Sequence, residues 1–144
     1  MREIEVSFQA SVTGVSAAWV RRMVAGTLKL EKQKSREVSV LITDDRRIRA
    51  INKKSLGHDY ATDVISFWAK PGTLVGRESG YLGDLVVSAQ TARSMAKELG
   101  LPFREELGRY LVHGTLHLLG YDDKASADRK KMHTRQESIL KKLL

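Results

Sequence analysis

The sequence contains no cysteine. Disulfide bonds and thiolate-ligated metals are therefore excluded, and any bound metal must use nitrogen and oxygen ligands. No apolar run approaches the ~20 residues that a membrane-spanning helix needs. Residues 1–5 also lack the hydrophobic region of a signal peptide. We therefore expect no membrane association and a cytoplasmic location. With no repeat, no low-complexity segment and no evident domain boundary, residues 1–144 are expected to form a single domain.

Positive charge is abundant, with 25 lysines and arginines against 17 acidic residues and a net charge of +8. This balance favours polyanionic partners such as RNA or DNA. In a helical projection of residues 44–56, Ile48 and Ile51 lie opposite a basic stripe of Arg46, Arg47, Arg49, Lys53 and Lys54. The last helix has a second such stripe, formed by Lys130, Lys131, Lys141 and Lys142. A solvated helix face explains either stripe alone, whereas the two together favour contact with nucleic acid.

Hydrophobic periodicity predicts alternating strands and helices. Strands are expected at residues 3–8, 38–42, 63–68 and 84–87, and a loop at residues 71–80. Helices are expected from Ser16 to about residue 30, from Asp44 or Asp45 to Gly57, from Ser88 to Gly100, from Pro102 to about residue 119, and from Ser126 to the C-terminus. We predict an α/β (α+β) fold in which one mixed sheet of about four strands is covered by about five helices, with the helix of residues 102–119 at its centre.

That central helix carries the most informative motif in the chain. His113 and His117 stand four residues apart, so they lie one above the other on one helix face. Gly120 then ends the helix, and Asp122 and Asp123 follow. Two imidazoles on a rigid element plus a carboxylate on the returning loop form a ligand set that zinc accepts.

Other interpretations of this motif remain open from the residues alone. The two histidines can be hydrogen-bonded core or cleft residues without a metal, and the two aspartates can be capping residues ahead of the last helix. A zinc protease is disfavoured, because the residue after His113 is Gly114, where proteases of the H-E-x-x-H type carry their general base.

Three blocks of the sequence together resemble the YbeY family of bacterial rRNA maturation factors. Residues 113–123 match the family motif H-G-x-L-H-L-x-G-Y-D-H at every specified position except the last, and T-D-V-I-S-F and G-D-L-V-V-S precede it at residues 62–67 and 83–88. The resemblance covers nearly the whole chain. It implies an α/β fold, a three-histidine zinc site and a metal-dependent, single-strand-specific endoribonuclease acting in maturation and quality control of small-subunit rRNA.

Two positions depart from the family pattern. The third metal ligand of the family is a histidine, and its position is occupied by Asp123. The resemblance therefore implies a metal site of His113, His117 and Asp123, which we expect to be catalytic as well. A carboxylate ligand is harder than an imidazole, so Mn²⁺ or Mg²⁺ becomes a credible occupant beside Zn²⁺. It also partly neutralises the metal and should weaken it as a Lewis acid.

The second departure lies where the family usually has aromatic-Arg-Gly, with its arginine in the active-site groove. Ser55 and Leu56 replace the aromatic residue and the arginine. Arg109 and His58 are hypothetical replacements, although a surface salt bridge and solvent exposure explain them equally well. The alternative function is accordingly a non-catalytic ribosome-assembly or RNA-binding factor with a structural or vestigial metal site.

Four further residues have a structural and a functional interpretation. Asp63 and Asp84 each open a predicted strand, where we expect them to bond turn amides rather than orient ligands. Trp68 and Tyr121 can stack on bases, although packing is the expected role of isolated aromatics.

Overall fold

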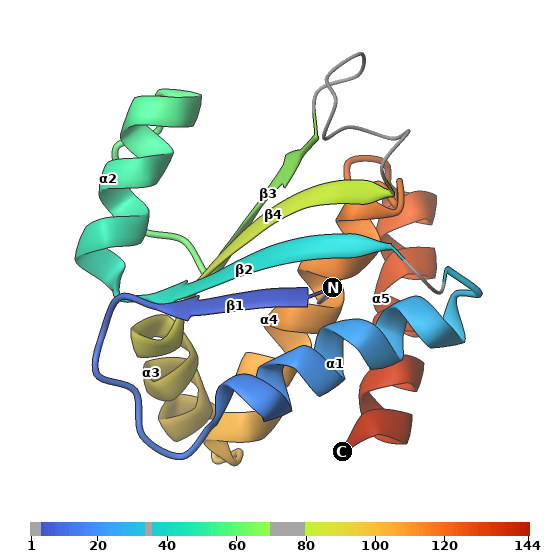
Figure 1. The fold of residues 1–144 in the computed structure, drawn as a ribbon, viewed down its shortest axis with the longest axis horizontal. Coiled ribbons are helices and arrows are strands. Elements are labelled where there is room, and N and C mark those ends of the chain that lie inside the picture. Colours follow the sequence, from blue (N-terminus) through green and yellow to red (C-terminus); the bar gives the residue numbers. More distant parts are fainter. Residues whose placement is uncertain (1–3, 34–35, 70–79) are drawn as a thin grey trace.

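The computed structural model describes residues 4–33, 36–69 and 80–144 (Figure 1). The element order predicted from the sequence is confirmed. The strands are β1 (Ile4–Phe8), β2 (Glu37–Thr43), β3 (Val64–Trp68) and β4 (Tyr81–Ser88). The helices are α1 (Ala17–Leu30), α2 (Asp45–Leu56), α3 (Ala89–Leu99), α4 (Phe103–Leu118) and α5 (Ser126–Leu143). The predicted loop at 71–80 lies, up to residue 79, outside the described residues.

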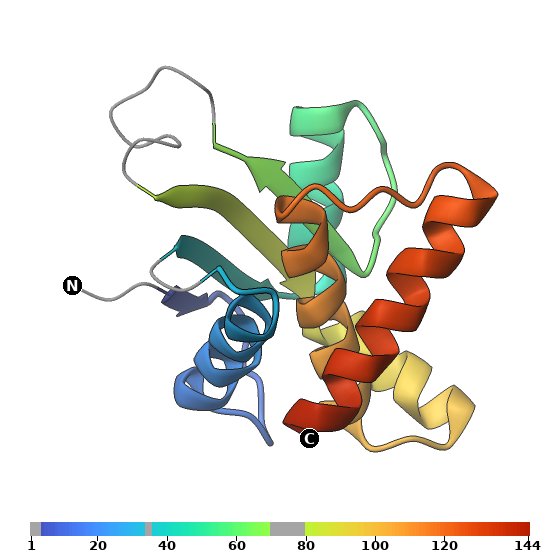
Figure 2. The same ribbon diagram turned by 90° about the vertical axis from the view of Figure 1, so that its right-hand side faces the viewer.

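The four strands form one mixed sheet in the order β1-β2-β4-β3. Strands β1, β2 and β4 are parallel, and β3 pairs antiparallel with β4. Helices α1, α3, α4 and α5 lie on one face of the sheet, while α2 lies on the other (Figures 1 and 2). The alternation along β4 explains these two layers. Leu85 and Val87 belong to the main core, whereas Val86 faces Ile48 of α2.

Local capping sets most helix boundaries where the sequence predicted them. The side chains of Ser16, Asp44 and Ser88 accept hydrogen bonds from the amides of Trp19, Arg47 and Thr91, as N-cap residues do. Gly57 and Gly100 end α2 and α3 in the left-handed conformation.

The predicted start of β4 at Asp84 is wrong, because the strand begins at Tyr81. The register between β2 and β4 shifts at Glu37 and Val38, opposite Tyr81 and Gly83. Gly83 has a φ of +146°, and a Cβ there would lie 2.0 Å from the Phe67 carbonyl oxygen. A glycine and an irregular register interrupt the alternating pattern from which strands are predicted. The predicted start of β3 at Asp63 is one residue early.

Helix α4 is central, as predicted. It contacts α1, α3 and α5 as well as β3 and β4, and ten of its residues are buried. It lies close to the sheet at Gly114, where a Cβ would lie 2.9 Å from Leu85 Cδ2 and 3.0 Å from Val64 Cγ2. The Ser66 hydroxyl donates a hydrogen bond to the Gly114 carbonyl, at 3.1 Å. Any side chain at this position would crowd Leu85 and Val64, which agrees with the expectation that an H-E-x-x-H protease is disfavoured.

None of the helices among the described residues is long and apolar enough to cross a membrane.

Candidate metal centre

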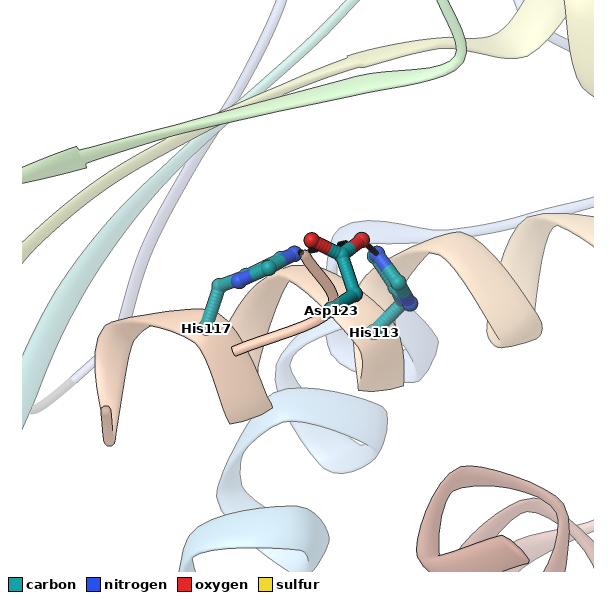
Figure 3. A group of neighbouring side chains, drawn as sticks. All are labelled: His113, His117 and Asp123. Carbon is teal, nitrogen blue, oxygen red and sulfur yellow. Dashed lines mark ion pairs between the residues drawn. The ribbon is translucent and has the colours of Figure 1, made fainter. Parts of the chain in front are cut away.

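His113, His117 and Asp123 converge at the C-terminal end of α4 (Figure 3). One ligand atom from each residue lies within 4.8 Å of the other two. The Oδ2 atom of Asp123 is 3.3 Å from His117 Nε2 and 3.7 Å from His113 Nε2. Within the described parts of the chain, this is the only group of three or more histidines and acidic residues with such spacing.

The loop after α4 brings Asp123 back over the two imidazoles. Gly120 has a φ of +99°, and the Tyr121 amide donates to the Leu116 carbonyl at 3.1 Å, which reverses the chain as a glycine allows. The Tyr121 hydroxyl donates to Glu31 Oε1 at 2.6 Å. Glu31 is in turn held by Arg135 of α5 at 2.7 Å. The loop is therefore held by Glu31, the C-cap residue of α1, which Arg135 of α5 holds in turn. This fixes the start of the segment that carries Asp123.

Hydrogen bonds at Nδ1 direct Nε2 of both imidazoles toward Asp123. His117 Nδ1 lies 3.0 Å from the Tyr121 carbonyl oxygen. A carbonyl oxygen only accepts, so Nδ1 carries a proton, and in the neutral ring Nε2 presents its lone pair. His113 Nδ1 lies 2.6 Å from Gln136 Oε1. Such bonds at the second ring nitrogen orient histidines that bind metals.

The donor set fits a divalent cation. In a tetrahedral site with ligands about 2.0–2.2 Å from the metal, neighbouring ligand atoms are about 3.3 Å apart. The two distances to Asp123, 3.3 and 3.7 Å, are close to that separation. Two nitrogen lone pairs and a carboxylate repel one another unless a metal cation or a proton lies between them. Three protein ligands also leave a fourth position open, as in catalytic zinc sites.

Asp122 and Asp123 differ in position although they are adjacent. Asp122 is exposed, and its carboxylate accepts a hydrogen bond from the Lys124 amide at 3.0 Å. The N-cap residue of α5 is Ala125, without a side-chain cap. The capping interpretation is therefore wrong for Asp123, whereas Asp122 is a loop residue, as the family pattern implied.

The three residues open into a cleft of about 370 Å³ between α2, β3 and α4. Leu56 lies on the opposite wall and is 49% exposed. His58 and Tyr60 also line the cleft, with stacked rings whose centroids are 5.4 Å apart. Trp68 is another lining residue and is 60% exposed. The expected packing role is therefore wrong for Trp68, although it is confirmed for Tyr121, which packs against the main core.

The structure does not bring Arg109 into this cleft. Its guanidinium forms ion pairs with Glu105, Glu106 and Glu137. The salt-bridge interpretation is therefore confirmed, and the hypothesis that Arg109 replaces the family arginine is wrong. His58, the other hypothetical replacement, does line the cleft.

The two strand aspartates have different roles. The Asp63 carboxylate accepts from the Val64 amide at 2.7 Å, which agrees with the predicted turn role, and Asp63 also lines the cleft. Asp84 lies within β4 and accepts from the Tyr81 hydroxyl instead, so the turn role is wrong for Asp84.

Sequence reasoning missed Gln136 and Tyr60. Gln136 is a polar residue on the apolar stripe of α5, four positions after Met132 and three before Ile139, and all three residues are buried. A buried polar side chain needs a hydrogen-bond partner, so its position on the stripe was the available signal. No such pattern marks Tyr60, which lies in the loop between α2 and β3.

The fold and this cluster define an α/β protein with a candidate metal centre at the floor of an open cleft. A family model described as Endoribonuclease YbeY matches residues 5–144. The chain belongs to this family.

Relatives and a solved structure agree with this assignment. Over 108 residues the chain is 45% identical to the Endoribonuclease YbeY of Sulfurihydrogenibium sp., covering 74% of this chain and 70% of the relative. Over 146 residues it is 35% identical to that of Persephonella marina, covering 99% and 94%. The solution structure of TM1509 from Thermotoga maritima has a similar fold, with a TM-score of 0.66, 22% identity and coverage of 97% and 88%.

Proposed function

We propose that this protein is a metal-dependent endoribonuclease that cuts single-stranded RNA, with the metal bound by His113, His117 and Asp123. The observation that carries the proposal is the convergence of these three side chains at an open cleft in a chain that belongs to the endoribonuclease family. The two imidazoles hold the cation, and the carboxylate reduces its net charge. When bound, the metal supplies Lewis-acid polarisation of a phosphodiester oxygen and a more acidic water.

The proposed metal is Zn²⁺, because two histidines and a carboxylate form a catalytic zinc ligand set in other enzymes. Mn²⁺ and Mg²⁺ are the alternatives that the oxygen ligand admits.

The cleft walls support a single-stranded RNA substrate. Tyr60 and Trp68 are more than half exposed at the cleft, and stacking of one base on an aromatic side chain contributes about 1–3 kcal/mol. Bases in a duplex are not available for such stacking. Helix α2, which contributes Asn52 and Leu56 to the cleft, also carries exposed basic residues, of which Arg49 and Lys53 are paired with Asp59 at 2.8 and 3.8 Å. The basic side chains of this helix favour phosphate binding.

Further parts of the proposal follow the family resemblance. We assign the RNA substrate to the small ribosomal subunit, the location to the cytoplasm, and residues 1–144 to one domain. The non-catalytic alternative is less well supported, because structural zinc sites are closed by four protein ligands. The cluster of His113, His117 and Asp123 instead faces a cleft.

The test of the function is cleavage of an end-labelled RNA by protein that has been stripped with a chelator and then reloaded with one metal at a time. We expect no cleavage by the stripped protein, recovery with Zn²⁺ or Mn²⁺, and preference for single-stranded over duplex RNA. The His117→Ala variant, purified in the same way, reports contaminating nuclease. Chelator-resistant cleavage, or equal cleavage by the variant, would contradict the proposal. RNA binding without cleavage, together with strong destabilisation by the chelator, would favour the non-catalytic alternative.

Restoring an arginine at position 56 should increase activity. Leu56→Arg places a guanidinium in the cleft where a phosphate can accept two hydrogen bonds. We expect kcat/KM on single-stranded RNA to rise roughly tenfold, and the slope of log K against log salt to steepen by about 0.7. The matched control is Ser55→Arg, which adds the same charge at an adjacent exposed residue that does not line the cleft. Equal gains in both variants would show that general charge, not position, causes the effect.

A further inference from the structure

A buried glutamine contacts one of the two histidines of the candidate metal centre. Gln136 of α5 is 5% exposed, and its Oε1 atom lies 2.6 Å from His113 Nδ1. Nδ1 is the ring nitrogen that points away from Asp123, because Nε2 is the atom 3.7 Å from the Asp123 carboxylate. The contact therefore bears on the orientation and the tautomer of His113.

The neighbours of Gln136 determine which end of its amide faces the histidine. Gln136 Nε2 donates to Glu137 Oε2 at 2.9 Å. The pKa of Glu137 is lowered, chiefly by its hydrogen bond with Arg109, so the group stays an ionised carboxylate that only accepts. The amide nitrogen of Gln136 must therefore face Glu137, and its oxygen must face His113. His113 Nδ1 then has to donate, and in the neutral ring its Nε2 carries the lone pair.

Arg109 holds Glu137 in place by two hydrogen bonds, from Nε at 2.9 Å and from Nη2 at 3.0 Å. The same guanidinium also binds Glu106, one turn earlier on α4. The polar chain thus begins on α4 at Arg109, crosses to Glu137 and Gln136 on α5, and returns to α4 at His113. Bidentate arginine–carboxylate pairs hold their geometry well, so the amide is fixed at both ends.

We propose that Gln136 is a positioning residue for the metal at His113, held in a fixed orientation by Glu137 and Arg109. This inference rests on the proposed function, because it assumes that His113 binds the metal. Gln136 selects the neutral tautomer with a free Nε2 before a cation arrives, which lowers the cost of binding. The Tyr121 carbonyl does the same for His117 at 3.0 Å. That group is backbone, so substitution can remove only the contact to His113.

The first test reads the tautomer in metal-free protein. Long-range ¹H–¹⁵N correlation spectra, recorded at a pH where imidazoles are neutral, distinguish protonation at Nδ1 from protonation at Nε2. We expect His113 to be protonated at Nδ1 in the wild type and in the double variant Gln136→Glu, Glu137→Gln, which keeps an acceptor for His113 and a donor between residues 136 and 137. In Gln136→Leu we expect a mixture in which Nε2–H predominates, as in free imidazole side chains. An unchanged tautomer in Gln136→Leu would overturn the proposal.

The second test measures zinc affinity by competition with a chromophoric chelator. We expect Gln136→Leu to raise the zinc Kd about 10–100-fold, the range typical for residues that orient metal ligands. The double variant Gln136→Glu, Glu137→Gln should bind more tightly than Gln136→Leu. Thr134→Val is the matched control, because it replaces an exposed polar residue of the same helix and should leave the Kd unchanged. Equal Kd values for the wild type and Gln136→Leu would contradict the proposal.

Two further variants separate the possible failures. If Gln136→Leu does not fold, Glu137→Gln takes its place. It removes the carboxylate that fixes the Gln136 amide while keeping a side chain of the same shape. We expect its zinc Kd to be about 3–10-fold above that of the wild type. If neither the wild type nor His117→Ala binds zinc, the metal site itself is contradicted. The tautomer of His113 then still shows whether Gln136 orients this imidazole.

Discussion

Replacing His117 by alanine is expected to abolish RNA cleavage, with a loss of roughly a thousandfold or more. His117 contributes Nε2, which lies 3.3 Å from Asp123 Oδ2. Without it, two protein ligands remain on a divalent cation, and the cleft loses the charge that stabilises a phosphodiester during cleavage. The measurement is kcat/KM on an end-labelled single-stranded RNA at saturating Zn²⁺.

Two controls make this result specific. His133→Ala removes an exposed histidine of α5 outside the cleft, and we expect its activity to match the wild type. Thermal melting with and without Zn²⁺ separates folding from binding, because a ligand that binds only the native state raises Tm. We expect zinc to stabilise the wild type and His133→Ala but not His117→Ala. Full activity in His117→Ala would refute the proposed site.

Replacing Asp123 by alanine is expected to raise the metal Kd more than about 100-fold, because a direct ligand contributes more than the residues that orient ligands. Asp122→Ala should change the Kd by no more than about twofold, since surface carboxylates interact weakly with distant charges. The two residues are adjacent, but only Asp123 faces the imidazoles, whereas Asp122 binds the Lys124 amide. Metal titration of both variants compares the same substitution one residue apart.

A third variant at this position tests the choice of metal. Asp123→His supplies the three-imidazole set that the family resemblance implies, and we expect it to favour Zn²⁺ over Mn²⁺ more strongly than the wild type does. Equal effects of Asp122→Ala and Asp123→Ala would show that the two carboxylates act only through general charge.

The sequence predicted the helices well, because their boundaries depend on local chemistry. Ser16, Asp44 and Ser88 are capping residues whose side chains bond amides three positions later. Gly57 and Gly100 end helices by adopting positive φ. The start of β4 could not be predicted in this way. It depends on the register with β2 and on the approach of Gly83 to the Phe67 carbonyl, and both involve residues distant in sequence.

The candidate ligands could also be proposed from the sequence, because a four-residue spacing places His113 and His117 on one helix face. The roles of Arg109 and Gln136 could not. Arg109 lies one turn before His113, which suggested a place in the site, but three glutamates from α4 and α5 hold it elsewhere. Gln136 is far from the histidines in sequence, and only the packing of α5 against α4 brings it to His113.

X-ray diffraction from zinc-loaded crystals, with data collected on both sides of the zinc absorption edge, is the decisive measurement of the proposed metal site. We expect one anomalous peak bonded to Nε2 of His113, Nε2 of His117 and a carboxylate oxygen of Asp123, at about 2.0–2.2 Å from each, with the remaining position open to the cleft. A peak at another place, or one bonded to the two histidines with Asp123 turned away, would contradict it.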